Sequence, residues 1–562
     1  MRVPKTPIQL YTNKEDIPFL LRHCAEQLLV NAKLTGCSSL LCDFAADSDY
    51  EVFCTSHPDI NEIVYRHTPN EDTLGLLYQS LCAIEQRKST GSFYTPAAIA
   101  KRLITTHFPA ISDEQTIFDP ACGTGIFFLE LPDSIPLDHL YGNDLNHICI
   151  TITRINLALK YRVSTSEELA VLYQHFTVSD YLSSTEAPAY DIILGNPPWG
   201  ATLSDKQKKQ YMHTFSCANQ NNMEIFDLFI EQALRQLVPD GFLSFVLPEA
   251  LFTVRLHAPI RALLLASTTA VSVEYLGNVF KNVYCPSIIL TVKKEPSVSF
   301  YRNTIVTNKT KHYRLCADRA LSSDYFSFSL TDEEYFLLEK LKRTANCVTL
   351  KGNADFALGI VTGNNDLLIY DTPQDGAEPI LRGSDISKYH IHRFSGYLRF
   401  VPEELQQTAP ETYYRAKEKL FYRFINRQLT FAYDDTGLLS LNSCNIVIPR
   451  IEGVPVKYIL AVLNSKVAQF IFEKQFASVK VLRSHLEAIP IPLSNDRLYC
   501  QIVDMVDILI STDSHSEEFR LTYCALEQQI AQLYDLTGSE YQLIAASVDD
   551  FISLNKKSAR KP

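Results

Sequence analysis

Short apolar runs alternate with helix-like apolar spacing over residues 116–292, and this alternation predicts the main domain of the chain. The helical stretches, such as 224–237, repeat apolar residues every three or four positions, whereas the short runs between them are nearly continuous. Such alternation is typical of an α/β domain with a mostly parallel sheet, and the last two runs resemble a closing hairpin. We therefore expect a Rossmann-like, seven-stranded sheet with strands near 116–118, 140–144, 176–179, 191–195, 242–247, 271–276 and 287–292.

The segments on either side of this domain have different patterns. Apolar spacing at 17–29 and 74–84 predicts a helical N-terminal segment, and we read it as packing or partner surface. Beyond about residue 300 the alternation is lost, and a second, α+β domain rich in Tyr, Arg and Lys is expected before a helical end. The predicted domains are 1–85 (helical), 86–300 (α/β), 301–497 (α+β) and 498–562 (helical tail).

Composition places the chain among ordinary globular proteins. Of its 562 residues, 46% are hydrophobic and 21% charged, and no apolar run approaches the roughly 20 residues of a membrane span. The N-terminus has no apolar signal region, so we expect a cytoplasmic protein without a membrane partner. The 14 cysteines are scattered without a Cys-x-x-Cys pair, which favours reduced thiols and predicts no metal site.

The strand expected at 191–195 runs directly into Asn196, Pro197, Pro198 and Trp199. Prolines fix φ and end the strand, and in open α/β sheets ligands bind at that edge. The Asn196 side-chain oxygen and the Pro197 carbonyl could each accept one N–H of an amino group on a flat ring, while Trp199 stacks on the ring. On its own, the tetrapeptide is equally compatible with a plain surface turn.

A second loop with ligand-binding chemistry follows the strand at 116–118. Asp119 stands at its tip, and Gly123 and Gly125 allow a tight turn and a close approach to the backbone before a helix at 126–131. The dinucleotide-binding fingerprint is incomplete, so pyrophosphate is not favoured, whereas Asp119 could hold an ammonium group.

Further acidic residues follow the next strands. Asp144 ends the strand at 140–144, where a carboxylate can bind ribose hydroxyls, and Asp180 follows the strand at 176–179. Thr95 has the character of a helix N-cap with Pro96 as the first helical residue.

These motifs together resemble the TaqI-like branch of the class I S-adenosylmethionine-dependent methyltransferases, which methylate adenine N6 in DNA as part of restriction-modification systems. The resemblance covers roughly residues 75–300. It implies catalysis by Asn196, Pro197, Pro198 and Trp199, with Trp199 and Phe280 stacking on a flipped target base, although Phe280 could also be a core aromatic. The cofactor contacts it implies are Tyr94, Thr95, Pro96, Asp119, Pro120, Ala121, Cys122, Gly123, Gly125, Asp144, Leu145, Asp180, Tyr181 and Asn196.

The region 380–483 carries 15 Lys and Arg against 9 Asp and Glu, a net charge of +6 in a chain whose total is −12. Segments such as 359–365 and 381–386 resemble target-recognition domains, so we expect this region to bind double-stranded DNA. A solvated basic surface without a partner is the alternative. Our candidates are Lys417, Lys419 and Arg423 for phosphates and Arg382 for a base.

The sequence thus predicts a sequence-specific DNA adenine-N6 methyltransferase that uses S-adenosylmethionine. Cytosine N4, an RNA adenine or a protein glutamine also presents an amino group on a planar carbon, so each remains an alternative substrate. A non-catalytic DNA-binding module is the alternative of a different class. A separately encoded restriction endonuclease or specificity subunit is a possible partner.

Overall fold

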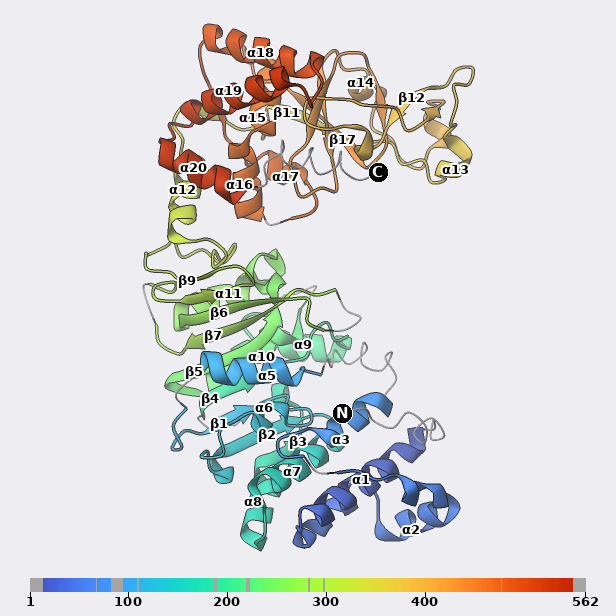
Figure 1. The fold of residues 1–562 in the computed structure, drawn as a ribbon, viewed down its shortest axis with the longest axis vertical. Coiled ribbons are helices and arrows are strands. Elements are labelled where there is room, and N and C mark those ends of the chain that lie inside the picture. Colours follow the sequence, from blue (N-terminus) through green and yellow to red (C-terminus); the bar gives the residue numbers. More distant parts are fainter. Residues whose placement is uncertain are drawn as a thin grey trace. The chain divides into compact units, whose positions relative to one another are not determined.

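A computed structural model describes residues 14–66, 68–81, 94–108, 111–184, 190–218, 223–280, 284–296, 299–476 and 478–548. The chain forms two compact units, Met1–Thr331 and Asp332–Pro562, and each is described by itself (Figure 1). In these residues no helix is both long and apolar enough to cross a membrane.

A nine-stranded sheet is the centre of the described part of the N-terminal unit (Figure 1). Its order is β3-β2-β1-β4-β5-β7-β6-β8-β9; β3 to β5 are parallel, and β7 is antiparallel to both of its neighbours. The strands are β1 (Ile117–Asp119), β2 (Leu140–Asp144), β3 (Phe176–Val178), β4 (Tyr190–Gly195), β5 (Leu237–Pro248), β6 (Thr269–Gly277), β7 (Ser287–Lys293), β8 (Ile305–Thr307) and β9 (His312–Arg314).

The predicted fold class is confirmed, and the seven predicted strands correspond to β1–β7. The sheet differs from the prediction in having two more strands, β8 and β9, which extend it beyond residue 300. Both lie beyond residue 300, where the alternation of apolar runs and helix-like spacing that predicted β1–β7 is lost.

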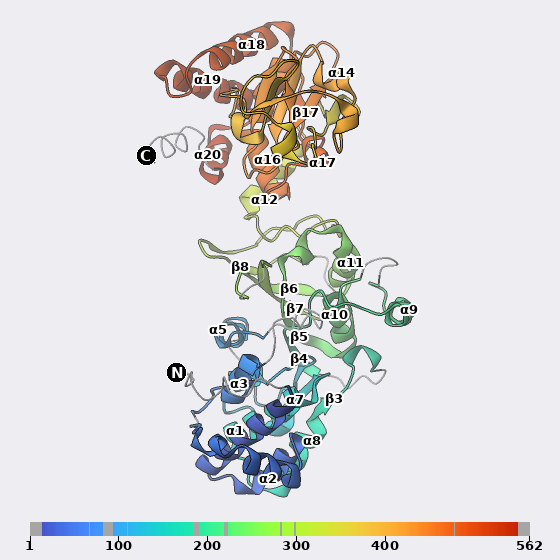
Figure 2. The same ribbon diagram turned by 90° about the vertical axis from the view of Figure 1, so that its right-hand side faces the viewer.

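Helices cover both faces of this sheet. Figure 2 shows α5 on one face and α10 and α11 on the other, while α1 and α3 of the N-terminal segment pack against α7. The helices are α1 (Ile17–Asn31), α2 (Asp47–Ser56), α3 (Thr73–Leu81), α5 (Ala97–Arg102), α6 (Ile126–Leu129), α7 (His147–Tyr161), α8 (Ser166–His175), α9 (Asp205–Thr214), α10 (Ile225–Gln236) and α11 (Ala258–Ser267).

The central strands are buried on both faces, as parallel strands covered by helices should be. Ile192, Ile193 and Leu194 of β4 are fully buried, and they belong to one apolar cluster that includes residues of α7 and α10. The carboxyl end of β4 is therefore held rigidly from both sides.

The C-terminal unit is α+β, as predicted. An antiparallel sheet of order β11-β17-β14-β15 is joined by the smaller sheets β13-β12-β16 and β10-β18. Helices α18 and α19 pack against α15, so the helical end of the chain belongs to this unit. The strands are β10 (Cys347–Val348), β11 (Ala354–Ala357), β12 (Glu378–Leu381), β13 (Tyr397–Leu398), β14 (Lys419–Arg423), β15 (Phe431–Asp434), β16 (Leu439–Ser440), β17 (Cys444–Pro449) and β18 (Ile491–Pro492). The helices are α12 (Asp332–Lys342), α13 (Asn365–Leu368), α14 (Glu411–Tyr414), α15 (Val456–Asn464), α16 (Lys466–Phe476), α17 (Arg483–Leu486), α18 (Asp496–Ser511), α19 (Glu517–Leu533) and α20 (Gly538–Ser547).

Candidate active site

The carboxyl ends of β2, β1 and β4 lie side by side at one edge of the sheet, because these strands are parallel neighbours. Asp144 ends β2, Asp119 ends β1, and Asn196 directly follows β4. Asp180 lies two residues beyond the end of β3, the next parallel strand. The topology therefore brings all four of these sequence-predicted side chains to a single edge.

Asp119 is a fully buried carboxyl group. Its Oδ1 accepts a hydrogen bond from the Ala121 amide at 3.1 Å, whereas Oδ2 is buried and accepts none from any residue that the structure describes. Burial, with a smaller contribution from the charge of Asp144, raises the pKa of Asp119 well above its usual value. A buried carboxylate without a partner is costly, so this arrangement suits a cationic ligand group.

Gly195 is required beside Asp119. Its φ is +149°, and a Cβ at this position would lie 2.5 Å from Asp119 Oδ1. Only glycine lets the end of β4 approach the buried carboxyl group so closely.

The glycine loop is fixed to the end of β2. Asp144 Oδ2 accepts a hydrogen bond from the Gly123 amide at 3.0 Å, and its Oδ1 accepts one from the Asn146 amide at 2.8 Å. Gly123 and Gly125 both have positive φ, which favours glycine. The helix after the loop is shorter than predicted, since α6 ends at Leu129 instead of 131.

Asn143 ties three of these loops together, and sequence reasoning gave it no role. Its Nδ2 donates to the Ser179 carbonyl at 2.9 Å, and its Oδ1 accepts from the Ser179 hydroxyl at 2.6 Å. Its carbonyl also accepts from the Cys122 amide. Its only signal in the sequence is a polar residue just inside a strand end.

The other expected cofactor residues differ in exposure. Asp180 accepts hydrogen bonds from the Leu182 amide at 3.1 Å and the Ser183 hydroxyl at 2.7 Å. Tyr181 is buried, and its ring packs against Phe118 and Phe229. Leu145, in contrast, is 73% exposed directly beside Asp144 and offers an apolar surface to a ligand.

The segment 94–96 reaches the same region from the N-terminal side. The Tyr94 ring lies edge to face with Tyr78, and its hydroxyl is 4.0 Å from Cys149 Sγ at the start of α7. The predicted cap is wrong by one position, because α5 begins at Ala97 and no side chain caps it; Pro96 is the extended residue before it. Residues 90–93 lie outside the described part of the chain.

The Asn-Pro-Pro-Trp segment directly follows β4. Pro197 and Trp199 are buried, whereas Asn196 and Pro198 are partly exposed. Glu224, which the sequence did not indicate, accepts a hydrogen bond from the Gly200 amide at 3.2 Å and so fastens the end of this turn. Phe280 contacts Trp199 directly, with ring centroids 5.0 Å apart.

The structure separates the four basic residues proposed for DNA. Lys417 is exposed and Arg382 partly exposed. Lys419 is fully buried, pairs with Asp434 and donates to the Tyr414 carbonyl at 2.7 Å. Arg423 donates from Nε to the Ile386 carbonyl at 3.0 Å.

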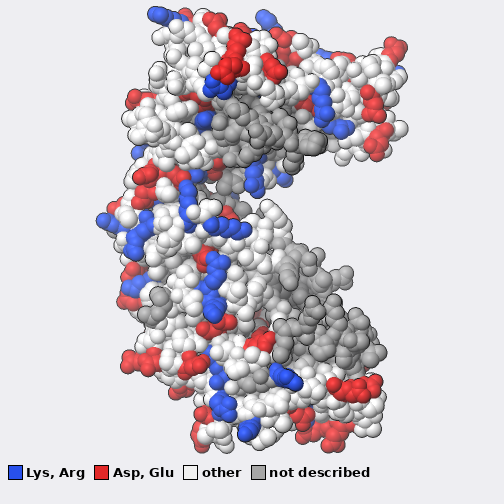
Figure 3. Space-filling view, in the orientation of Figure 1, with Lys and Arg blue, Asp and Glu red and all other residues white. Residues whose placement is uncertain are grey.

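The structure does not favour the predicted phosphate contacts of Lys419 and Arg423, since both cations are held by groups of their own domain. The net charge of a region does not tell which cations face solvent. On the face drawn in Figure 3, Lys and Arg side chains are interspersed with Asp and Glu.

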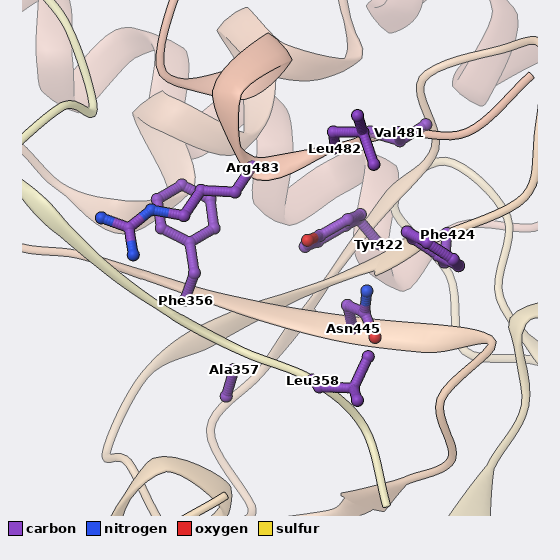
Figure 4. Close-up of a pocket in the computed structure, with 9 residues that line it drawn as sticks. All are labelled: Phe356, Ala357, Leu358, Tyr422, Phe424, Asn445, Val481, Leu482 and Arg483. Atoms are coloured by element: carbon purple, nitrogen blue, oxygen red, sulfur yellow. The ribbon is translucent and has the colours of Figure 1, made fainter. Parts of the chain in front are cut away.

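A pocket of about 200 Å³ opens on the C-terminal unit between β11, β14, β17 and the start of α17 (Figure 4). Its lining is aromatic at Phe356, Tyr422 and Phe424, with the polar Asn445 and Arg483. The Arg483 guanidinium lies over the Phe356 ring, 5.1 Å from its centroid.

Two extended segments, 424–426 and 479–481, pair beside this pocket, and we call them the 425/480 ladder. The Val481 amide donates to the Phe424 carbonyl at 2.8 Å, and the Asn426 amide donates to the Val479 carbonyl at 2.9 Å. Ile425 is 65% exposed and Val479 48% exposed, with exposed Arg427 and Lys480 beside them. The ladder thus presents exposed apolar and cationic side chains.

The described residues contain no cluster of three or more His, Cys, Asp or Glu side chains placed to hold a metal ion.

Two family models match the chain, in the order expected. Residues 70–324 match N-6 DNA Methylase, and residues 378–491 match the TaqI-like C-terminal specificity domain. The first match includes the strand-edge residues described above, and the second includes the 425/480 ladder.

Similar proteins include the type II methyltransferase M.VspI of Vibrio sp. (strain 343), which is 26% identical over 335 residues, 58% of this chain and 78% of that protein. The type I restriction enzyme EcoEI methylase subunit of Escherichia coli is 26% identical over 43% of this chain and 51% of its own length. The modification methylase CviBIII of Paramecium bursaria Chlorella virus NC1A is 25% identical over 41% of this chain and 57% of its own length. The chain thus spans little more than half the length of the last two relatives.

Solved structures share the fold at low sequence identity. The type IIL restriction-modification enzyme MmeI in complex with DNA has a TM-score of 0.55 at 13% identity, over 86% of this chain and 83% of that chain. The DrdV–DNA complex has a TM-score of 0.52 at 12% identity, over 88% of this chain and 66% of that chain. With its methylase region followed by a specificity domain, the chain belongs to the TaqI-like N6-adenine DNA methyltransferase family of restriction-modification systems.

Proposed function

We propose that this protein methylates the N6 amino group of adenine at a specific sequence of double-stranded DNA, with S-adenosylmethionine as methyl donor. The observation that carries the proposal is the gathering of Asp119, Asp144 and Asn196 at one sheet edge, in a chain that also has a specificity domain. Ligands of open α/β sheets bind at such an edge.

The described residues fit the proposed cofactor. The unpartnered Asp119 Oδ2 suits the ammonium of its amino-acid part. Asp144 is held in place by two backbone amides and retains acceptor capacity for ribose hydroxyls, and the exposed Leu145 beside it suits a ring face. When bound, S-adenosylmethionine supplies an electrophilic methyl group on a sulfonium.

Asn196 and Pro197 are proposed to bind the amino group that is methylated. The side-chain oxygen of Asn196 and the carbonyl of Pro197 are acceptors, and Pro197 and Pro198 have no N–H that would compete. Two accepted N–H bonds would draw the nitrogen lone pair out of conjugation with the ring and orient it. Catalysis would then rest on positioning and hydrogen bonding, without a general base of perturbed pKa.

The target base has to leave the duplex to reach this edge, because the exocyclic nitrogen of a stacked base is not accessible to a buried donor. Trp199 and Phe280 are the aromatic groups proposed to stack on the extruded base. Base flipping is accordingly part of the proposal.

The C-terminal unit is proposed to select the DNA sequence. Phosphate contacts give affinity without specificity, whereas groups that reach base edges give specificity. Of the described cations, Lys417, Arg427 and Lys480 are exposed and suited to phosphates, and Arg382 remains a candidate base reader. The exposed Ile425, which pairs with Lys480 across the ladder, suits contact with a groove.

In the cell, we propose a cytoplasmic modification enzyme of a restriction-modification or related defence system. The similar proteins are named as type II methyltransferase, type I methylase subunit and modification methylase. A restriction endonuclease or a specificity subunit from a separate gene would be its natural partner.

The test is modification-sensitive long-read sequencing of plasmid DNA from a host that expresses the chain, beside a host that expresses Asn196→Ala. We expect N6-methyladenine at one recurrent sequence with the wild type and none with the variant. Methylation at cytosine N4 would overturn the adenine assignment, and unmodified DNA from a host with abundant folded protein would count against DNA as substrate.

A further inference from the structure

Asp72 is a buried carboxyl group just before α3, in a segment that the sequence predicts to be packing or partner surface. It is 7% exposed. Its Oδ1 accepts hydrogen bonds from the Gly75 amide and from Asn156 Nδ2, both at 2.8 Å, and its Oδ2 accepts one from the Thr124 hydroxyl. One carboxyl group therefore joins α3, α7 and the glycine loop.

Thr124 is the middle residue of the cofactor loop, between Gly123 and Gly125. It is buried, and its carbonyl accepts a second bond from Asn156 Nδ2 at 2.9 Å. Glycines at positive φ give a loop many accessible conformations. The bonds to Thr124 hold the loop on one side, while Asp144 holds the Gly123 amide on the other.

The first turn of α3 leaves room for the Asp72 carboxyl group. A Cβ at Gly75 would lie 2.0 Å from Asp72 Oδ2, so glycine is needed at the first turn of the helix. One turn later, the Tyr78 hydroxyl accepts a bond from Asn146 Nδ2 at 2.8 Å. Asn146 in turn donates its amide to Asp144. The same stretch therefore reaches both the loop and the residue next to the ribose-binding candidate.

Burial would oppose a charged group here, and it raises the pKa of Asp72, while the bonds from Thr124, Asn156 and Gly75 act in the opposite direction. Hydrophobic residues could fill this space between helices without such a cost. The polar contact is therefore better explained by what it holds in place.

We propose that Asp72 is a positioning residue for the cofactor: it fixes Thr124, and with it the glycine loop, in the conformation that binds S-adenosylmethionine. The inference rests on the proposed function, because it concerns the same cofactor site. It extends that site to residues 72–78 of the N-terminal segment.

The experiment measures S-adenosylmethionine binding by calorimetry for Asp72→Ala, Asp72→Asn and Thr124→Val in the full chain. Thr124→Val keeps the shape and removes the hydroxyl that Asp72 binds. We expect about 10-fold or greater weakening for Asp72→Ala and Thr124→Val, and partial recovery for Asp72→Asn, whose amide oxygen still accepts the Gly75 and Asn156 bonds. The double variant Asp72→Ala/Thr124→Val should be little weaker than either single variant, since both remove the same bond.

Thr291→Val is the matched control. Thr291 is also a buried threonine; its hydroxyl bonds to Ser244 on β5 and to the buried His107 ring, and not to the loop. Its loss should lower thermal stability and leave cofactor affinity unchanged. A second readout needs no cofactor: amide hydrogen exchange at residues 123–125 should quicken in Asp72→Ala and Thr124→Val, and stay unchanged in Thr291→Val.

The outcomes separate the two proposals. Equal affinity and equal exchange in wild type and the Asp72 and Thr124 variants would overturn the positioning role, whatever the enzyme methylates. A wild-type protein that does not bind S-adenosylmethionine would overturn the proposed function, and unchanged exchange at the loop would then overturn the inference as well. If the wild type does not bind S-adenosylmethionine but the loop of the Asp72 and Thr124 variants exchanges faster, Asp72 fixes the loop for another ligand. The inference about S-adenosylmethionine is then wrong.

Discussion

Trp199 and Phe280 lie edge to face, with ring centroids 5.0 Å apart and an interplanar angle of 82°. Both rings are almost fully buried. A base stacked on both would need the rings parallel and separated, so this pair has to open before a base can enter. The aromatic contact is thus expected to close the proposed base site when no DNA is bound.

Opening of this pair should be visible in fluorescence, because Trp199 is the only tryptophan of the chain. We expect the emission of Trp199 to change when duplex containing the target sequence is added with a cofactor analogue. Non-target duplex should leave it nearly constant, since only specific binding extrudes the base. Phe280→Leu is the companion variant: its starting emission should already differ, because the edge-to-face partner is gone. The same response to target and non-target duplex would count against stacking by Trp199.

Replacement of the proposed amine acceptor should remove catalysis and spare the cofactor. In Asn196→Ala the side-chain oxygen that orients the amino group is lost, so methyl transfer should fall below detection. Affinity for S-adenosylmethionine, measured by calorimetry, should stay within a few-fold, because Asp119 and Asp144 are untouched. Transfer near the wild-type rate would remove Asn196 from the mechanism.

Asp144→Ala should have the opposite profile. Its carboxylate holds the Gly123 and Asn146 amides and is the candidate for ribose hydroxyls. Loss of these charged hydrogen bonds should weaken cofactor binding by about 1–3 kcal/mol, with a smaller effect on the rate at saturating cofactor. Unchanged affinity in a titration would mean that the ribose is held elsewhere.

Cofactor affinity should rise with pH because of Asp119. Its pKa is raised well above the usual value by burial, so the group binds a proton over a range in which free aspartate is ionised. An ammonium beside Oδ2 would favour the ionised form and so lower the pKa of Asp119. Binding should therefore release a proton at pH values between the pKa of Asp119 in the complex and its raised pKa in the free protein. Asp144 lies close and its pKa is also raised by burial, so it should contribute in the same direction.

Calorimetry in buffers of different ionisation enthalpy measures this proton release. Asp119→Asn should release fewer protons and have weaker, flatter binding across the same pH range. If wild type and Asp119→Asn release equally many protons, the ammonium is not bound at Asp119.

The sequence identifies the strand ends well, because buried parallel strands are continuous apolar runs and the residues after them are polar. Asp119, Asp144 and Asn196 each follow such a run, and the structure places them at the ends of β1, β2 and β4. Contacts between distant segments have no such signal. Asp72 reaches Thr124 across 52 residues of sequence, and no local pattern around Asp72 reports this.

Charge along the sequence does not tell which cations are exposed on the folded domain. Lys417 and Lys419 lie two residues apart in a basic segment, yet one is exposed and the other is sealed in the core. Lys419 begins β14, and its ammonium binds Asp434 of the neighbouring strand β15. A count of charged residues includes both lysines, whereas the pairing of β14 with β15 buries Lys419 against Asp434 and leaves only Lys417 exposed.

These two lysines, with Lys480 of the 425/480 ladder, test how the specificity unit binds DNA. Lys417→Ala and Lys480→Ala should leave stability unchanged, weaken binding to target and non-target duplexes alike, and lower the salt slope by about one unit each, as loss of one phosphate contact does. Lys419→Ala should instead leave Asp434 buried without its partner and cost about 3–5 kcal/mol of unfolding free energy, without an effect on the salt slope of the protein that remains folded. Denaturant unfolding and DNA titrations at several salt concentrations measure both quantities on the same three variants. If Lys417→Ala and Lys480→Ala both keep the wild-type salt slope, the DNA lies on another surface of this unit. If Lys419→Ala is stable and has a reduced salt slope, the ammonium of Lys419 contacts a phosphate.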